Sequence, residues 1–139
     1  MATATKFNAF AENVYEGVHN FGSDTLKVML TNTAPVATNS VKADLTEITA
    51  GNGYTAGGET ITITSSSQTG GTYTLVGNDV VFTASGGSIG PFRYVVIYND
   101  TPTAPVDPLI QFYDYGSSIT LNDGETFTVN FGASILSHS

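Results

Sequence analysis

The segment 91–98 constrains the fold of this chain more than any other. It reads Pro-Phe-Arg-Tyr-Val-Val-Ile-Tyr, and every residue except the arginine is apolar, aromatic or proline. An apolar run this short is typical of a β-strand that is buried on both faces. Asn99, Asp100 and Pro102 follow it, and such residues end strands in turns. We therefore expect residues 94–98 to form the central strand of a sheet.

Shorter alternating segments on both sides of this strand predict further strands. They are separated by turns rich in glycine, asparagine and proline, and they comprise residues 25–31, 59–65, 72–84, 109–115 and 118–131. No helix is predicted between consecutive strands. The pattern therefore predicts a mainly β fold, either an antiparallel β-sandwich or a jelly-roll-like barrel, with one N-terminal α-helix.

Two of these segments are interpreted as hairpins. In residues 72–84 a turn at Gly77 and Asn78 sets Leu75 opposite Val80 and Tyr73 opposite Phe82. In residues 118–131 a left-handed Gly124 sets Ile119 opposite Phe127. The expected core comprises Leu75, Phe82, Tyr94, Val96, Ile110, Phe127 and Val129.

Residues 6–19 are the only segment with a convincing helical pattern. Phe7, Phe10 and Val14 belong to an apolar stripe at helical spacing, and Asn20 and Gly22 suit the exit from a helix. The stripe must pack on the sheet or on a neighbouring subunit. Residues 1–5 are small and polar and are predicted to form a flexible arm, so that residues 6–139 form a single domain.

Composition excludes several classes of function. The chain of 139 residues has a net charge of −8 and only four basic residues, which are scattered, so we expect no nucleic-acid binding. The absence of cysteine excludes disulfides and thiolate metal sites. No apolar run approaches the roughly 20 residues of a membrane span, so no membrane partner is expected. The N-terminus lacks the pattern of a signal peptide, which indicates synthesis in a cytoplasm.

Residues capable of catalysis or metal binding show no convergent pattern in the sequence. His19 and His138 lie near opposite ends of the chain and are expected to be exposed. Asp100, Asp107 and Asp114 sit at strand ends, where solvated polar groups are ordinary. We therefore predict no catalytic residue, no metal site and no cofactor.

The aromatic strand 109–115 allows two interpretations. Tyr113 and Tyr115 fall on one face of the strand and Phe112 on the other. The tyrosines could form a platform for sugar rings. A core or subunit-interface face is the preferred interpretation.

Several motifs of this chain resemble those of a known class of proteins. They are residues 90–102, Pro108-Leu109-Ile110, Tyr113-Asp114-Tyr115-Gly116 and Asn122-Asp123-Gly124-Glu125-Thr126-Phe127, together with the opening residues 7–19 and 24–35. With them the chain resembles small structural proteins of tailed bacteriophages, over about two thirds of its length. The resemblance implies a virion protein, and the size best fits a capsid decoration (cement) protein. Such proteins typically bind the outer shell as oligomers, often trimers, and clamp neighbouring capsid subunits.

The leading hypothesis is therefore a non-enzymatic capsid decoration protein, made in the host cytoplasm and located on the virion surface. Its expected partners are the major capsid protein and further copies of itself, as a homotrimer. The alternative is a tail or fibre module that binds host glycans, and a third reading, a carbohydrate-active enzyme, would need two converging carboxylates. The candidate interface residues are Ala2, Thr3, Thr5, Phe7, Phe10, Val14, Phe112, Tyr113 and Tyr115.

Overall fold

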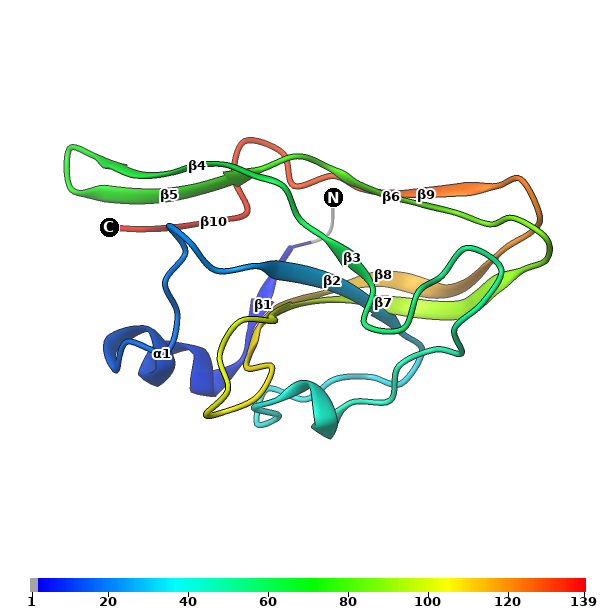
Figure 1. Cartoon of the computed structure of the whole chain (residues 1–139), viewed down its shortest axis with the longest axis horizontal. Helices are drawn as coiled ribbons and strands as arrows, with labels where there is room; N and C mark the ends of the chain where they lie inside the picture. The colour runs from blue at the N-terminus through cyan, green and yellow to red at the C-terminus, as the bar shows by residue number, and fades with distance from the viewer. Residues whose placement is uncertain (1–2) are drawn as a thin grey trace.

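The computed structural model describes residues 3–139 and contains two layers of antiparallel strands (Figure 1). One layer is a five-stranded sheet in the order β1-β8-β7-β2-β3. Its strands are β1 (Thr5–Lys6), β2 (Leu26–Thr31), β3 (Glu59–Thr60), β7 (Ile89–Asn99) and β8 (Leu109–Leu121). This mainly β, antiparallel arrangement agrees with the predicted β-sandwich.

Two small sheets form the other layer of the sandwich (Figure 1). One has the order β10-β5-β4, and the other pairs β6 with β9. Their strands are β4 (Ile63–Thr69), β5 (Thr72–Gly77), β6 (Val80–Thr83), β9 (Thr126–Val129) and β10 (Leu136–His138).

Strand β7 is central to the five-stranded sheet, as the sequence predicts. Its residues alternate between two apolar clusters: Val95 and Ile97 face the small sheets, whereas Val96 and Tyr98 face away from them. All four side chains are buried. The continuous apolar run therefore reflects a strand that is covered on both faces.

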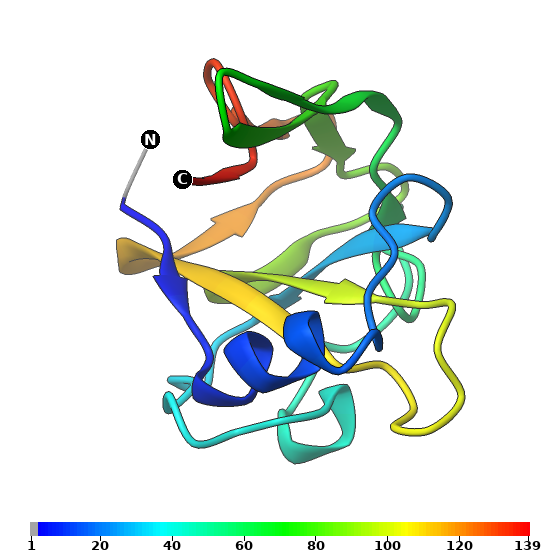
Figure 2. The same cartoon turned by 90° about the vertical axis from the view of Figure 1, so that its left-hand side faces the viewer.

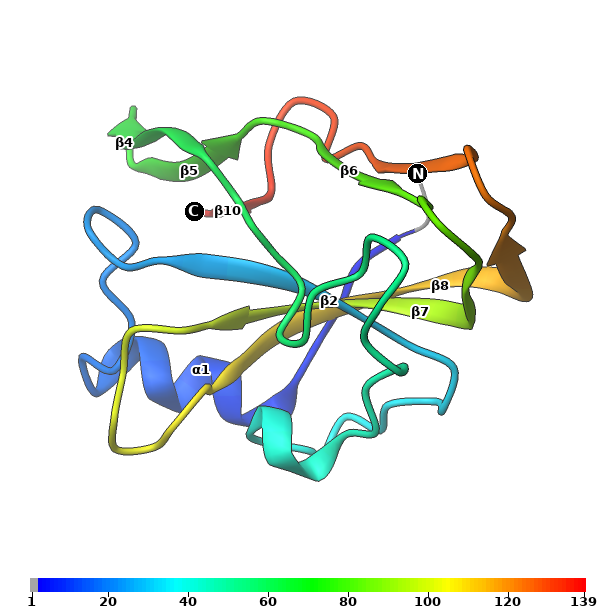
Figure 3. The same cartoon turned by 45° about the vertical axis from the view of Figure 1, so that its right-hand side comes forward.

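The second face of the sheet is covered by the helix and by long connections. Helix α1 (Asn8–Tyr15) and the 3-10 turn η1 (Lys42–Asp44) lie on this side, as does much of the connection 32–58 (Figure 3). Phe7 and Leu109 pack here with residues of β2 and β7. The molecule therefore has a third, irregular layer, which the sequence pattern does not predict.

The helix is shorter than the predicted span of residues 6–19. It ends at Tyr15 because Gly17 adopts a left-handed conformation, with φ of 77°. The N–H of Gly17 donates to the carbonyl of Val14 and that of Val18 to the carbonyl of Asn13, the paired bonds of a Schellman motif. The predicted exit at Asn20 and Gly22 is therefore wrong by about one turn.

Two residues of the predicted arm 1–5 are in contact with the folded domain. Thr5 and Lys6 form β1 and pair with Phe112 and Gln111 of β8. Ala4 is partly buried against the main core. Thr5 thus belongs to the domain, and the predicted arm position Ala2 lies outside the described residues.

Both predicted hairpins are wrong. Strand β5 pairs with β4 and β10, and β6 pairs with β9, so the chain passes from one small sheet to the other at Gly77 and Asn78. Phe127 lies opposite Phe82, whereas Ile119 lies opposite Phe92. The turn at Gly124 is nevertheless left-handed, with φ of 89°, as expected.

Five of the seven predicted core residues are buried. They are Leu75, Phe82, Val96, Ile110 and Val129. Tyr94 and Phe127 are only half-buried, because both lie near the end of the sandwich where β8 bulges outward.

Candidate functional sites: the β8 bulge and the end groove

The candidate interface residues separate into buried and accessible ones. Phe7, Phe10 and Tyr113 are buried within the chain, because α1 and β8 pack their apolar side chains into the core. These three side chains therefore offer little surface to a partner, and their contact with one stays a prediction. The accessible candidates are Thr3, Thr5, Val14 and Tyr115, with Phe112 half-buried against Phe7.

A bulge in β8 presents the most exposed of these aromatic side chains. Asp114 lies opposite Tyr94, but the next paired residue of β8 is Ile119, opposite Phe92. The four residues 115–118 thus face the single residue Arg93, an excess of three, and all four are exposed. We call residues 114–118 the β8 bulge. Bulges of this kind re-aim side chains at the margin of a sheet.

Tyr115 projects from the β8 bulge and is 54% exposed. Its ring meets that of Phe127 edge-on, with 5.7 Å between the ring centroids. Phe127 in turn contacts the buried Phe92, with 5.0 Å between centroids. The exposed tyrosine is therefore supported by a chain of aromatic contacts that leads into the core.

A forked ion pair fixes the start of the β8 bulge. Arg93 donates from Nε and Nη2 to the two carboxylate oxygens of Asp114, at 2.8 and 3.1 Å. These bonds, and a further one from the N–H of Gly116, hold the pKa of Asp114 below its usual range. The guanidinium of Arg93 also lies over the ring of Tyr94, 5.5 Å from its centroid. The bulge thus combines Tyr and Arg, the residue types that dominate protein-binding surfaces.

A groove of about 810 Å³ lies at the opposite end of the molecule, between α1 and the β10-β5-β4 sheet. We call it the end groove; Figure 2 faces this end of the sandwich. Apolar and aromatic side chains form most of its lining: Phe10, Val14, Tyr15, Phe21, Tyr73 and Leu136.

Both histidines line the end groove, although they are far apart in the sequence. His19 is partly buried, with its ring stacked on Phe21 and tilted against Phe10. His138 on β10 is exposed, and its Nε2 lies 3.4 Å from the hydroxyl of Tyr15. The prediction of exposed histidines is therefore wrong for His19, because the fold brings residues 19–21 onto α1.

Hydrogen bonds fix the tautomer of His19. The Oδ1 of Asn99 accepts from the N–H of Thr101 at 3.1 Å, so its Nδ2 must be the group facing Asp24 and His19. This Nδ2 can only donate, and it lies 3.0 Å from Nδ1 of His19. Nδ1 is therefore an acceptor, and the ring proton is on Nε2.

The Nε2–H of His19 is a buried donor without a partner among the described residues. Burial lowers the pKa of His19 to about 4, and the nearby carboxylate of Asp24 only partly offsets this effect. The ring is thus neutral at physiological pH. An unpaired buried donor of this kind is rare in folded proteins.

Two carboxylates do converge, although not in either hollow. Asp100 and Asp107 lie at the two ends of the connection between β7 and β8. Burial and the neighbouring charge of Asp100 raise the pKa of Asp107. Lys27 lies 3.7 Å from Asp100 and balances part of the charge. Neither acid lines the end groove or the smaller hollow of about 210 Å³ near Thr46–Thr49.

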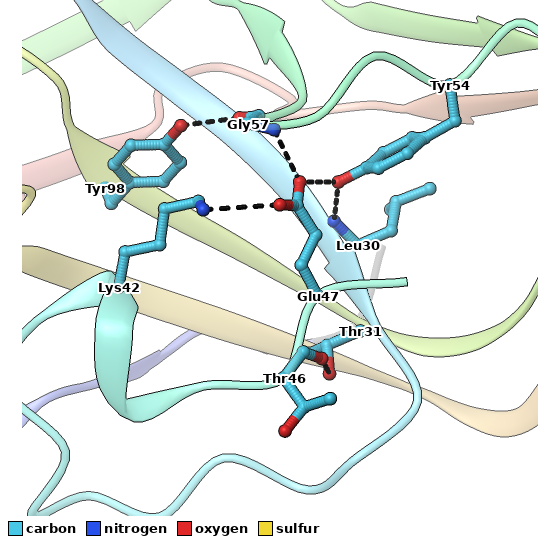
Figure 4. A network of polar contacts seen from close by, with 8 residues as sticks. All are labelled: Leu30, Thr31, Lys42, Thr46, Glu47, Tyr54, Gly57 and Tyr98. Carbon is cyan, nitrogen blue, oxygen red and sulfur yellow. Dashed lines mark hydrogen bonds and ion pairs between the residues drawn. The ribbon is translucent and has the colours of Figure 1, made fainter. Parts of the chain in front are cut away.

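A polar network around Glu47 attaches the long connection to the sheet (Figure 4). Glu47 accepts from the hydroxyl of Tyr54 at 2.5 Å and from the N–H of Gly57 at 2.7 Å, and Lys42 lies 3.2 Å away. The Tyr54 hydroxyl also accepts from the N–H of Leu30 in β2. Every polar group here has a partner within the chain, so we assign the network to folding.

Neither clustered metal ligands nor a membrane span is found in the part of the chain that the structure describes. Within residues 3–139, no three side chains of histidine, aspartate or glutamate come together as a metal site would require. The helices of this range also lack the length and apolarity needed to cross a bilayer.

Comparison with known proteins adds no assignment. No family model matches the chain, and neither a curated protein nor a solved structure does.

The end groove cannot be predicted from the sequence, because its lining comes from separate segments of the chain. Its walls come from residues 6–22, 66–73 and 136–138, which have no shared motif. One signal is present in the sequence: His19 and Phe21 alternate with polar residues just after the helix. Without knowledge of the end of the helix, these residues cannot be placed next to β10.

Proposed function

We propose that this chain is a non-enzymatic structural protein that binds a larger protein assembly. We place it on the outer shell of a tailed-bacteriophage head, as a capsid decoration protein. The resemblance of its strand and turn motifs to phage structural proteins supports the second part. The observation that carries the first part is the β8 bulge, which holds an exposed Tyr115 beside a forked Arg93–Asp114 pair.

The β8 bulge suits a protein partner for energetic reasons. Its aromatic support and ion pair hold Tyr115 and Arg93 in place before binding, so that little side-chain freedom is lost on contact. Tyrosine and arginine in such settings commonly contribute 2 kcal/mol or more, by order of magnitude, to a protein interface. The major capsid protein is the proposed partner, and the contact residues are Tyr115 with its immediate neighbours.

The proposal is tested by adding purified protein to phage heads that lack it. Wild-type protein should bind in hundreds of copies per head, whereas Tyr115→Ala should bind about tenfold more weakly or worse. Val106→Ala is the matched control, because Val106 is 60% exposed on a connection that does not belong to the bulge. Its binding should equal that of the wild type.

Two results would contradict the proposal. Failure of the wild-type protein to bind heads, together with a few copies on purified tails, would favour the tail or fibre module that binds host glycans. Equal binding of Tyr115→Ala and wild type would remove the β8 bulge as the contact.

A further inference from the structure

We propose that the outer edge of β4 pairs with the same edge of a second copy of this chain, antiparallel about a two-fold axis at Ser67. The small sheets of the two copies then join into one, in the order β10-β5-β4-β4-β5-β10. This inference does not rest on the capsid role, because the contact is between copies of this chain and the purified protein is enough to test it.

Strand β4 is the longest strand at a sheet margin in the part of the chain that the structure describes. It has seven residues and ends the sheet β10-β5-β4 on one side. The strands at the other margins have two residues in β1 and β3, three in β10, and four in β6 and β9. Strand β4 also lies at the outside of the molecule (Figure 1). An edge of this length leaves backbone N–H and C=O groups free to pair with another chain.

The hairpin of β4 and β5 identifies which backbone groups are free. Its two-residue turn, 70–71, has a positive φ at both glycines. Such a turn makes the pair that flanks it, Thr69 and its partner in β5, a hydrogen-bonded one. Every second residue back along the strand, such as Ser67, bonds to β5 in the same way. The backbone groups of Ser66 and Gln68 therefore point away from β5, and no other described segment bonds to them.

These two residues make the edge complementary to itself. A pair centred on Ser67 sets Ser66 opposite Gln68 of the second copy, and Gln68 opposite Ser66 of the second copy. All four residues present free backbone groups, so both pairs can form their hydrogen bonds. Neighbouring two-fold registers would instead use Thr64, where the pairing with β5 is irregular, or Gly70 in the turn. Ser67 then faces its own copy across the axis.

The distribution of charge favours a second copy as the occupant of this edge. The chain has a net charge of −8, so most of its surface repels another copy. No charged residue lies between Glu59 and Asp79, however, and β4 also lacks proline. Charges and prolines are the usual protection of an exposed edge. A two-fold contact at β4 thus brings hydroxyl and amide groups together without like charges, as a self-complementary surface requires.

The contact is small, because regular pairing with β5 is confined to residues 65–69 of β4. Interfaces that bury well below about 1,000 Å² are weak. We therefore expect the paired form to be a minor one in dilute solution. It becomes favoured where another contact holds two copies side by side, since their effective concentration is then high.

Disulfide trapping detects such a weak pair, and the absence of cysteine from the chain removes any background. Ser67→Cys sets two thiols opposite each other across the axis, in a non-hydrogen-bonded pair where side chains are closest. In a buffer of oxidised and reduced glutathione, this variant should form disulfide-linked dimers at least about tenfold more readily than Val106→Cys. Val106 is the control because its side chain is 60% exposed outside β4.

Two further cysteines test the register. Thr69 faces Ser65 of the second copy in the proposed pair, whereas the two copies of Thr69 are about 13 Å apart along the strands. Thr69→Cys alone should therefore cross-link no more than Val106→Cys, and a mixture of Thr69→Cys and Ser65→Cys should cross-link readily. Equal dimer yields at positions 67, 69 and 106 would overturn the proposal.

Charges at Ser67 test the pairing without a covalent bond. The side chain of Ser67 is exposed, so Ser67→Glu and Ser67→Lys should both fold. Either variant alone places like charges opposite each other, whereas a mixture places opposite charges there. In NMR spectra of concentrated ¹⁵N-labelled Ser67→Glu, unlabelled Ser67→Lys should shift the amide signals of Ser66 and Gln68, and unlabelled Ser67→Glu should not. Equal effects of the two added variants would refute a pair with its axis at Ser67.

Discussion

At the scale of single residues, burial in two separate clusters predicts that truncating side chains of β7 is costly. Val96 is fully buried in the cluster beneath the sheet, where it packs with Phe7, Met29 and Leu109. Val81 is also in a strand, but 51% of it is exposed. The same valine-to-alanine change therefore has different consequences at these two positions.

Val96→Ala should lower the free energy of unfolding by about 2–3 kcal/mol, because it leaves a cavity that the sheet cannot close. Val81→Ala should cost less than about 1 kcal/mol, since its side chain is largely in solvent. Urea denaturation of both variants measures the difference. Similar losses at the two positions would contradict the assignment of β7 to the centre of the fold.

His19 should give the stability of this protein a pH dependence in the acidic range. Its pKa is 6.5 in the unfolded chain and about 4 in the folded chain. Between these values the unfolded state binds more protons, so the free energy of unfolding falls as the pH falls. The contribution is complete above pH 6.5 and absent below pH 4.

The size of this effect should be about 1–2 kcal/mol, because solvent reaches part of the ring. His19→Phe should remove it, so that the difference in stability between variant and wild type changes between pH 6.5 and pH 4. Urea unfolding at the two pH values provides the measurement. A difference that stays constant with pH would show that His19 titrates alike in both states.

At the scale of elements, close backbone approach fixes where the connection 51–58 crosses the sheet. A Cβ atom at Gly58 would lie 1.8 Å from the carbonyl oxygen of Val28, and the φ of Gly58 is 83°. Gly70, in the turn between β4 and β5, also has a positive φ, 59°, but has open space around it. Comparing substitutions at the two glycines therefore distinguishes the cost of a steric clash from the cost of backbone strain alone.

Gly58→Ala should cost more than about 3 kcal/mol, because β3 must move away from β2 to admit the methyl group. Gly70→Ala carries only the left-handed penalty of about 1–2 kcal/mol. Thermal unfolding of the two variants distinguishes them. Equal losses would mean that the connection yields without disturbing the pairing of β2 and β3.

Strand pairing is also where prediction from the sequence reaches its limit. Leu75, Val80, Phe82 and Phe127 were correctly placed on apolar strand faces. Their partners were not, because alternation is satisfied equally by a local hairpin and by pairing with a distant strand. Gly77 looks like a turn residue, but a Cβ there would lie 2.8 Å from Ile61 and 2.9 Å from Ile135. It is a packing position, and only the folded neighbours reveal that.

At the scale of the whole molecule, the central strand and the sandwich follow from local pattern, whereas both candidate sites depend on long-range register. The β8 bulge exists because three residues more than the facing strand requires are placed between Asp114 and Ile119. The end groove exists because α1 ends at Tyr15, before the left-handed Gly17, and the residues that follow line the same hollow as β10. Neither feature leaves a periodic trace in the sequence.

The exposed aromatic side chains at the two ends of the molecule argue for self-association. Tyr15 is 76% exposed beside the end groove and Tyr115 is 54% exposed on the β8 bulge, while charged residues make up only 12% of the chain. A surface with so few charges has weak protection against association.

We expect sedimentation equilibrium to give a homotrimer, with three times the chain mass of 14.5 kDa. Tyr15→Ala and Tyr115→Ala, measured separately, should identify the end that forms the contact, because only that variant should shift the equilibrium toward monomer. A monomer at every concentration would contradict the expectation.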